Sequence, residues 1–181
     1  MAGASEELVG PFPEGADPVE YDKLRRRVLW SMPSGLYVVG SRSGARRNLM
    51  TLNWATQAAF EPKMLAIGVE QTAVTHQLID EGGVFSLSLI DREDRAIVRK
   101  FVKPVEIDIE ARTANGFPFH DGRTGAPVLN QAVAYLECEV RQAVGVGNHT
   151  LFIGEVVDAA FQKPEDTAVL RMEDTRMNYG G

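Results

Sequence analysis

Short runs of apolar residues, or of apolar and polar residues in alternation, recur along this 181-residue chain and predict β-strands. The predicted strands are 35–40, 48–60, 63–70, 84–90, 133–145 and 150–161, with weaker candidates at 107–109 and 168–172. Short turns join the first strands to one another, which is typical of an antiparallel meander rather than of βαβ units. We therefore expect a mainly β fold of about seven strands, closed or partly closed into a barrel.

Helices are predicted at three places. The segments 19–30 and 72–80 have apolar residues at helical spacing, whereas 93–102 is indicated by an acidic start at Asp91 and a proline at 104. Asp17 and Pro18 form a start signal for the first helix. We expect these few helices to pack on the ends of the barrel.

The predicted strand 48–60 carries an unusual number of polar side chains for a segment between two apolar strands. They include Asn48, Thr51 and Asn53, and Trp54 lies among them. Polar groups in a core region need partners, which are either backbone and cross-strand groups or a bound polar ligand. Strict alternation places Asn48, Met50 and Trp54 on one face, and Thr51 and Asn53 on the other unless a bulge intervenes.

Three further places could bind a ligand. The N-terminus of the helix at 72–80 offers free N–H groups and a threonine hydroxyl to an anion, although Thr72 could simply cap it. Arg99 and Lys100, near the end of the helix at 93–102, could supply a cation to the same anion or merely suit the helix dipole. His149 lies at a hairpin tip, where it could donate a proton, bind a ligand carbonyl or do neither.

Composition narrows the class of protein. A net charge of -6 and a pI of about 5.1 argue against nucleic-acid or anionic-membrane partners. The single cysteine, Cys138, excludes an intrachain disulfide and alternates like a buried strand residue, and three histidines with one cysteine do not favour a zinc site. No apolar run approaches the ~20 residues of a membrane span, and no signal peptide is indicated. A single cysteine fits a reducing compartment, so we expect a cytoplasmic protein.

Several separated stretches resemble the flavin reductase-like family, whose members bind FMN on a split β-barrel. These stretches span about residues 30–160 in the family's order. They are Pro33–Val39, Asn48–Trp54, Phe60–Pro62, Thr75–Ile79, Phe85–Leu89, Gly125–Leu129, Ala134–Cys138 and Asn148–Val156. The resemblance implies an antiparallel split β-barrel with a few flanking helices, as a single FMN-binding domain at 17–181. Residues 1–16 are rich in Gly, Pro and Glu, so we expect them to form an N-terminal arm.

The resemblance also implies a set of site residues. The flavin-binding strand contributes residues that match Asn48, Met50, Thr51, Asn53 and Trp54. The FMN phosphate is bound by residues that match Thr75 and Lys100, and His149 matches a histidine near the flavin or the nicotinamide. Three positions depart from the family pattern: Asn148 replaces an aspartate, Asn53 stands where serine is common, and Lys63 replaces a proline.

The function implied by the resemblance is hydride transfer from NAD(P)H to flavin by a homodimeric enzyme. Such an enzyme can be the reductase component of a two-component monooxygenase. Two alternatives remain open at this stage. One is an FMN-containing electron-transfer protein that lacks its own nicotinamide site and receives electrons from a partner, and the other is a barrel that binds a different apolar ligand.

Overall fold

The computed structural model describes residues 8–175 and residue 177. The chain divides into two compact units, of which the second is Ser34–Thr175 and the first contains the described residues up to Pro33. Of the predicted N-terminal arm at 1–16, residues 1–7 lie outside the described part.

The first unit is built on helix α1 (Pro18–Trp30). The carboxylate of Asp17 accepts a hydrogen bond from the backbone N–H of Glu20 at 2.9 Å, so the predicted start of this helix is confirmed. Arg25 donates to the carbonyl of Val9 at 2.9 Å and lies over the ring of Phe12, 5.0 Å from its centroid. These contacts hold the preceding segment against the helix.

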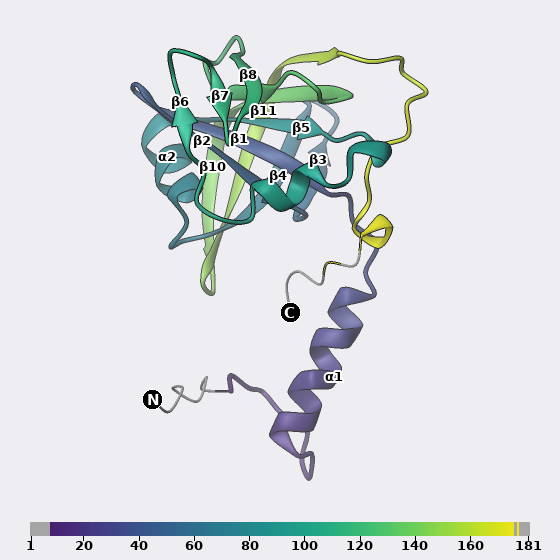
Figure 1. Ribbon diagram of the computed structural model, residues 1–181. Coiled ribbons are helices and arrows are strands. Elements are labelled where there is room, and N and C mark those ends of the chain that lie inside the picture. The colour runs from purple at the N-terminus through teal and green to yellow at the C-terminus, as the bar shows by residue number, and fades with distance from the viewer. Residues whose placement is uncertain (1–7, 176, 178–181) are drawn as a thin grey trace, which may run out of the picture. The chain divides into compact units, whose positions relative to one another are not determined.

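The second unit contains a seven-stranded sheet in which every neighbouring pair is antiparallel. Its strands in spatial order are β2 (Arg46–Leu52), β1 (Tyr37–Ser43), β5 (Val84–Leu89), β10 (Ala134–Val146), β11 (His149–Phe161), β4 (Met64–Glu70) and β3 (Ala55–Ala59). The two edges, β2 and β3, are joined by only Asn53 and Trp54. Such a link spans at most about 10 Å, so the sheet must curl until its edges approach each other (Figure 1). The predicted mainly β, antiparallel fold is confirmed.

The prediction of one continuous strand at 48–60 is wrong. β2 ends at Leu52 on one edge of the sheet, and β3 begins at Ala55 on the other. The N–H of Ala55 bonds to the carbonyl of Asn53 at 3.1 Å, and the N–H of Gly68 in β4 bonds to the carbonyl of Trp54 at 2.9 Å. The chain therefore turns a tight corner at 53–54, because it must leave one edge partner and acquire another.

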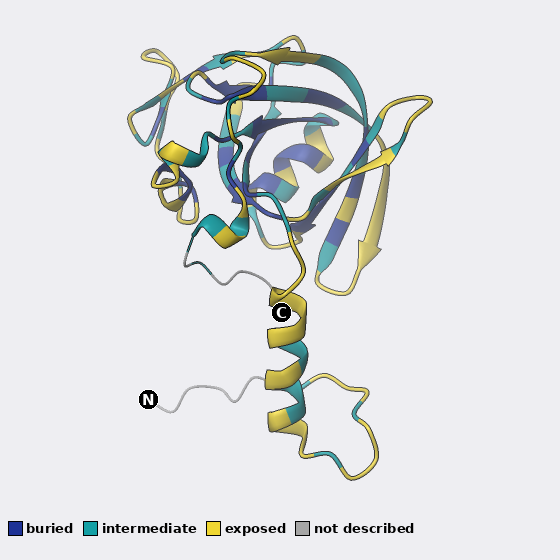
Figure 2. Cartoon of the chain, turned by 90° about the vertical axis from the view of Figure 1, so that its right-hand side faces the viewer, coloured by how far each residue is buried: buried dark blue, intermediate teal, exposed yellow. Residues whose placement is uncertain are grey.

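The main core lies inside the curled sheet. Figure 2 shows the buried residues concentrated on its strands. The core side chains are Val39, Leu52, Leu65, Ile67, Val69, Ile79, Phe85, Leu87, Cys138 and Phe152. Burial, and secondarily the charge of Glu137, raises the pKa of the Cys138 thiol to about 12, so this cysteine behaves as the buried apolar residue that the sequence predicts.

Helix α2 (Val74–Gly82) packs on β1 and β2. Leu78 and Ile79 are its buried apolar residues, and Gly83 ends it in a left-handed conformation with φ of 67°. The helix begins two residues later than predicted. Its N-cap is Ala73, which has no capping side-chain hydrogen bond, so the predicted alternative of a Thr72 cap is wrong.

A second, four-stranded sheet packs against the outside of β1 and β5. It consists of β6 (Ile107–Asp108), β7 (Thr113–Ala114), β8 (Phe117–Asp121) and β9 (Pro127–Leu129). The hydroxyl of Ser86 donates to the carbonyl of Pro127 at 2.6 Å. A Cβ on Gly40 would lie 1.9 Å from the same carbonyl oxygen, so the close approach of the two sheets requires glycine there. The sequence predicts only the first of these short strands.

The predicted helix at 93–102 is instead two short 3₁₀ turns, η1 (Arg92–Asp94) and η2 (Ile97–Lys100). Thr51 of β2 donates its hydroxyl to the carbonyl of Val98 and its N–H to the carbonyl of Phe101. The Val98 carbonyl also accepts the N–H of Phe101 at 3.2 Å, so η2 closes as a 3₁₀ turn against the edge of β2. The weak strand predicted at 168–172 is likewise reduced to two isolated bridges, Gly35–Arg171 and Asp91–Val169, followed by η3 (Met172–Asp174).

Candidate functional site

A buried polar pair joins β2 to the first turn of α2. The amide of Asn48 donates to the hydroxyl of Thr75 at 2.8 Å. Thr75 is fully buried and Asn48 is half-buried. Because the Thr75 oxygen accepts this bond, the bond does not use the Thr75 O–H as a donor.

The start of α2 is open to an anion. Its N-cap, Ala73, provides no side-chain acceptor, so the first N–H groups of the helix are not capped by a side chain. Uncapped N–H groups and the positive end of the helix dipole favour a phosphate or carboxylate at this point. The Thr75 hydroxyl lies within the same turn.

A second polar contact ties α2 to β11. Nε2 of His76 lies 2.8 Å from the hydroxyl of Thr150, and the His76 ring packs on Phe152 with 5.1 Å between centroids. Sequence reasoning did not single out Thr150. Alternation along β11 could have found it, since Thr150 must face inward if His149 faces outward.

An aromatic pair forms on the outer face of the sheet, where β4 ends and β11 begins. The rings of Trp54 and His149 lie 4.6 Å apart between centroids, inclined by 45°. Trp54 covers Gly68 so closely that a Cβ at this glycine would lie 3.1 Å from the indole. The indole nevertheless remains 42% exposed, which leaves part of its surface open to a planar ligand.

The histidine of this pair is held from several sides. Its Nδ1 lies 2.7 Å from the amide oxygen of Asn148, and its backbone carbonyl accepts a bond from the Gln71 amide at 3.2 Å. Glu70 of β4 is its direct cross-strand partner. Within the described residues, Nε2 of His149 has no hydrogen bond.

The remaining residues of the 48–54 stretch have different surroundings. Met50 packs on the main core, half-buried. Thr51 faces the opposite side of β2, with its polar groups bound to η2 as described above. Asn53 lies at the corner and is only 7% exposed, yet its side-chain amide has no hydrogen bond among the described residues.

Lys100 lies apart from the other predicted residues. It is exposed at the end of η2, and its carbonyl accepts a bond from the Asn115 amide at 2.7 Å. η2 is attached to β2 at Thr51, three residues from Asn48, which corresponds to about 10 Å along a strand. No contact of the Lys100 ammonium with the other candidate residues is present in the described part of the chain.

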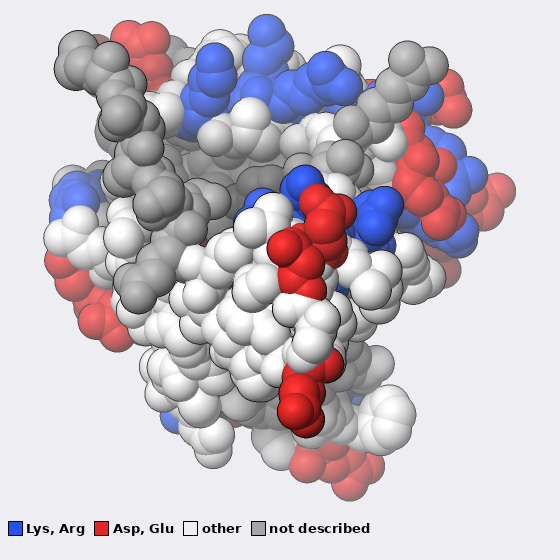
Figure 3. Space-filling model, turned by 90° about the horizontal axis from the view of Figure 1, so that it is seen from below, with Lys and Arg blue, Asp and Glu red and all other residues white. Residues whose placement is uncertain are grey.

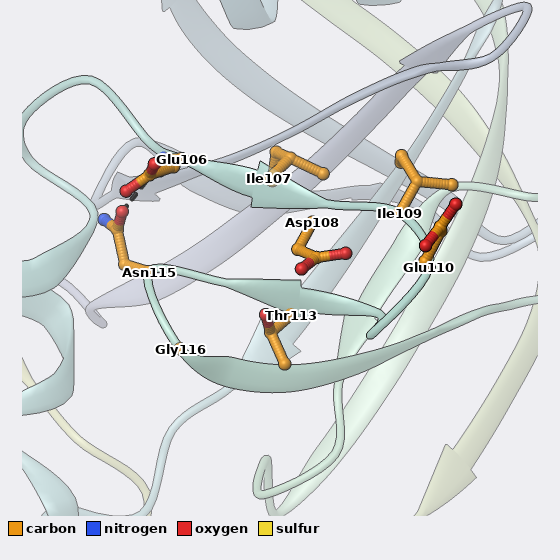
Figure 4. Close-up of a pocket in the computed structure, with 8 residues that line it drawn as sticks. All are labelled: Glu106, Ile107, Asp108, Ile109, Glu110, Thr113, Asn115 and Gly116. Atoms are coloured by element: carbon orange, nitrogen blue, oxygen red, sulfur yellow. Dashed lines mark hydrogen bonds between the residues drawn. The ribbon is translucent and has the colours of Figure 1, made fainter.

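A hollow of about 510 Å³ lies along the β6–β7 hairpin and shares no residue with the candidate site (Figure 4). Glu106, Asp108 and Glu110 contribute carboxylates to it, and Asn115 borders it next to η2. Both signs of charge occur on the face drawn in Figure 3. No group of three or more potential metal ligands occurs within the described residues, and no helix among them is long and apolar enough to cross a membrane.

The comparisons with known proteins give a consistent result. The model of the flavin reductase like domain matches residues 29–180. The chain is 33% identical over 149 residues to the ferric-chelate reductase (NAD(P)H) of Archaeoglobus fulgidus. This alignment covers 81% of this chain and 86% of that protein.

Two solved structures have the same fold. The NADH:FAD oxidoreductase SgcE6 of Streptomyces globisporus C-1027, in complex with NAD and FAD fragments, superimposes with a TM-score of 0.72 at 28% identity, over 87% of this chain and 91% of that one. The styrene monooxygenase flavin reductase of Pseudomonas putida S12 superimposes with a TM-score of 0.65 at 26% identity, over 77% of this chain and 86% of that one.

Proposed function

Since the chain belongs to the flavin reductase-like domain family, we propose that it is an oxidoreductase that transfers hydride from NAD(P)H to flavin, with FMN as the flavin. The related ferric-chelate reductase is named for NAD(P)H, and the related SgcE6 structure contains NAD and FAD fragments. The matched segment, 29–180, contains the whole of the second structural unit, so we assign flavin binding to this unit.

The observation that carries the proposal is the pairing of an anion site with an aromatic surface at one end of the sheet. The anion site is the uncapped start of α2 with the Thr75 hydroxyl, and the aromatic surface is the pair Trp54 and His149. Thr150 follows His149 directly and binds the first turn of α2 through His76, which links the two parts. A flavin mononucleotide combines a planar heterocycle with a phosphate, and these residues fit both parts.

We assign the residues to the flavin as follows. Thr75 and the first N–H groups of α2 bind the phosphate, and Lys100 supplies the cation from η2. Asn48, Met50, Asn53 and Trp54 contact the ring system, and the Asn53 amide, which makes no hydrogen bond among the described residues, is suited to a polar edge of that ring. Thr51 contributes by holding η2, and hence Lys100, against β2.

The bound flavin supplies the redox chemistry, accepting two electrons and a proton as hydride from the nicotinamide. The residues of the chain bind the flavin, orient its ring and shield it from water. Trp54 limits the movement of a ring stacked beside it, and His149 offers Nε2 to a polar group of flavin or nicotinamide. A proton can be exchanged at that nitrogen.

We also propose that the protein is a homodimer. Gly68, Leu151 and Val144 are cross-strand neighbours on the outer face of the sheet, and Val146 follows on the same face. Leu151 is 37% exposed, and Val144 and Val146 are each 44% exposed. Residues on a water-facing strand surface are usually polar, so an apolar row beside Trp54 suits contact with a second copy.

We propose that the partner that uses the reduced flavin is a monooxygenase or an electron-transfer protein. The name of the related styrene monooxygenase flavin reductase supports the first. We further propose a cytoplasmic location, which the single buried cysteine supports.

An anaerobic titration tests the proposed function. Purified protein with FMN, and separately with FAD, is titrated with NADH and NADPH while the flavin absorbance is followed. Bleaching of the flavin by either nicotinamide at catalytic rates is the expected result. Bleaching by dithionite but by neither nicotinamide would favour an electron carrier, and failure to bind either flavin would refute the proposal.

A further inference from the structure

The bond between His149 and Asn148 decides which nitrogen of the imidazole carries its proton. Nδ1 lies 2.7 Å from Oδ1 of Asn148. An amide oxygen can only accept, so this orientation of the Asn148 amide pairs with the tautomer in which Nδ1 carries the proton. In the neutral ring this leaves a lone pair on Nε2, which has no hydrogen bond among the described residues.

The other groups that face this imidazole make no hydrogen bond to its ring nitrogens among the described residues. Trp54 packs on the ring at 4.6 Å, and Val146 lies opposite it on β10. The carboxylate-bearing Glu70 lies opposite on β4 without an ion pair to the ring among the described residues, and His76 bonds to Thr150 on the inner face. The backbone is fixed as well, because the Gln71 amide donates to the His149 carbonyl and the Gln71 N–H donates to the Asn148 carbonyl at 3.0 Å.

We propose that Asn148 is a positioning residue that holds His149 in the Nδ1–H form and presents Nε2 as a hydrogen-bond acceptor to an N–H donor of the bound substrate. A carboxylate at position 148 would favour the protonated ring, in which Nε2 becomes a donor. A neutral amide makes no such demand, so the site is matched to a ligand that donates. The carboxamide of nicotinamide and the ring N–H of flavin are the two donors of this chemistry.

This inference rests on the proposed function for its ligand, but its first test does not need activity. The nitrogen chemical shifts of the His149 ring are measured by NMR in the flavin-free protein, with the signals assigned by H149Q. Wild type is expected to show Nδ1–H, and Asn148→Ala is expected to show a mixture of both forms. Nε2–H in wild type would overturn the inference while leaving the proposed function untouched.

Kinetics supply the second test and distinguish the two ligands. For Asn148→Ala we expect the KM for NADH, or instead the Kd for FMN, to rise about tenfold, as loss of one hydrogen bond predicts. A rise in the KM assigns the donor to nicotinamide and a rise in the Kd assigns it to flavin. If wild type oxidises NADH but neither constant changes in Asn148→Ala, the inference is wrong.

Two further variants separate positioning from simple structural support. Asn148→Asp keeps the acceptor but favours the protonated ring, so its activity profile is expected to move to higher pH. Asn130→Ala is the control, because it removes a histidine–asparagine bond of the same kind outside the candidate site. In that bond, Nδ1 of His120 lies 2.8 Å from the Asn130 amide oxygen. This control should leave KM, Kd and kcat unchanged, and an equal loss in both alanine variants would refute a specific role for Asn148.

Discussion

At the scale of single residues, the pair Asn48 and Thr75 serves two purposes. The bond between them satisfies two polar side chains in the interior of the sheet and fixes the first turn of α2 on β2. The same bond leaves the Thr75 proton free at the uncapped helix start. Thr75, which we assign to ligand binding, is therefore also part of the structural support of the site.

Replacement of Thr75 by alanine tests both purposes. We expect the Kd for FMN to rise about tenfold or more, because a hydrogen bond to a charged phosphate contributes about 1.5–3 kcal/mol. We also expect the free energy of unfolding to fall by about 1–3 kcal/mol, because the Asn48 amide loses its partner. Fluorescence titration with FMN and urea unfolding measure the two effects.

Thr75→Ser is the matched control for this prediction. It keeps the hydroxyl, so both the affinity and the free energy of unfolding should stay close to those of wild type. An unchanged Kd in Thr75→Ala would contradict the assignment of the phosphate to this helix start.

At the scale of elements, two close approaches build the framework around the site. The corner at Asn53 and Trp54 brings the edges β2 and β3 together, and the four-stranded sheet packs on the main sheet at Gly40. The first approach depends on a change of strand partner, and the second depends on the lack of a side chain. Both position β2, which carries Asn48.

Gly40→Ala is expected to destabilise the packing of the two sheets. The added methyl would lie 1.9 Å from the Pro127 carbonyl oxygen and 2.4 Å from the Ser86 hydroxyl, and neither group can move far because they bond to each other. The free energy of unfolding should fall by about 1–3 kcal/mol or more. Urea unfolding of the variant measures this change.

Gly145→Ala in β10 is the control for the sheet contact. The atom nearest to its added methyl is the Gln71 amide nitrogen at 3.9 Å, and the glycine has no positive φ. Its free energy of unfolding should stay within ~0.5 kcal/mol of wild type. Equal effects of the two substitutions would mean that the close approach at Gly40 does not limit stability.

At the scale of the whole molecule, the apolar row on the outer face predicts the assembly. We expect the protein to sediment as a dimer and Leu151→Lys to shift it toward the monomer, because a buried ammonium opposite apolar side chains is costly. Flavin affinity should fall in parallel if a second copy completes the site. Analytical ultracentrifugation with and without FMN measures both.

Phe161→Lys is the control for the assembly. Phe161 is 56% exposed and lies in the same strand, on the order of 30 Å from Leu151. It should leave the dimer intact. A wild-type protein that sediments as a monomer and retains FMN would refute the proposed dimer.

Acid is expected to weaken the attachment of the C-terminal segment. The hydrogen bond from Lys163, and then that from the N–H of Glu93, holds the pKa of Asp91 below its ordinary value of 3.8. The N–H of Arg171, and then the Arg92 guanidinium, lowers the pKa of Asp174. These carboxylates stabilise the fold above their unfolded pKa, and this contribution is lost as the pH falls through the lowered folded pKa.

The urea midpoint should therefore drop as the pH falls from about 5 through the folded pKa values, which lie below 3.8, and it should drop less in Asp91→Asn, which no longer loses a charge. Glu165→Gln, at an exposed position in the same segment, should keep the full drop. An identical pH dependence in Asp91→Asn and wild type would contradict a role for the Lys163 pair.

The sequence by itself determined most strands of the seven-stranded sheet, the start of α1 and the buried character of Cys138. These features depend on near neighbours along the chain, since alternation, helical spacing and capping are local rules. The family resemblance added the candidate residues.

Only the tertiary structure decided where the 48–60 strand divides and how the candidate residues meet. An alternating pattern looks the same whether a strand keeps its partner or leaves one sheet edge for the other, so the corner at 53–54 was not visible. The contacts between Asn48 and Thr75, and between Trp54 and His149, join segments that are distant in sequence. They exist because the curled sheet brings the end of β4, the start of β11 and the first turn of α2 together, and pairing of this kind is set by the packing of the whole sheet.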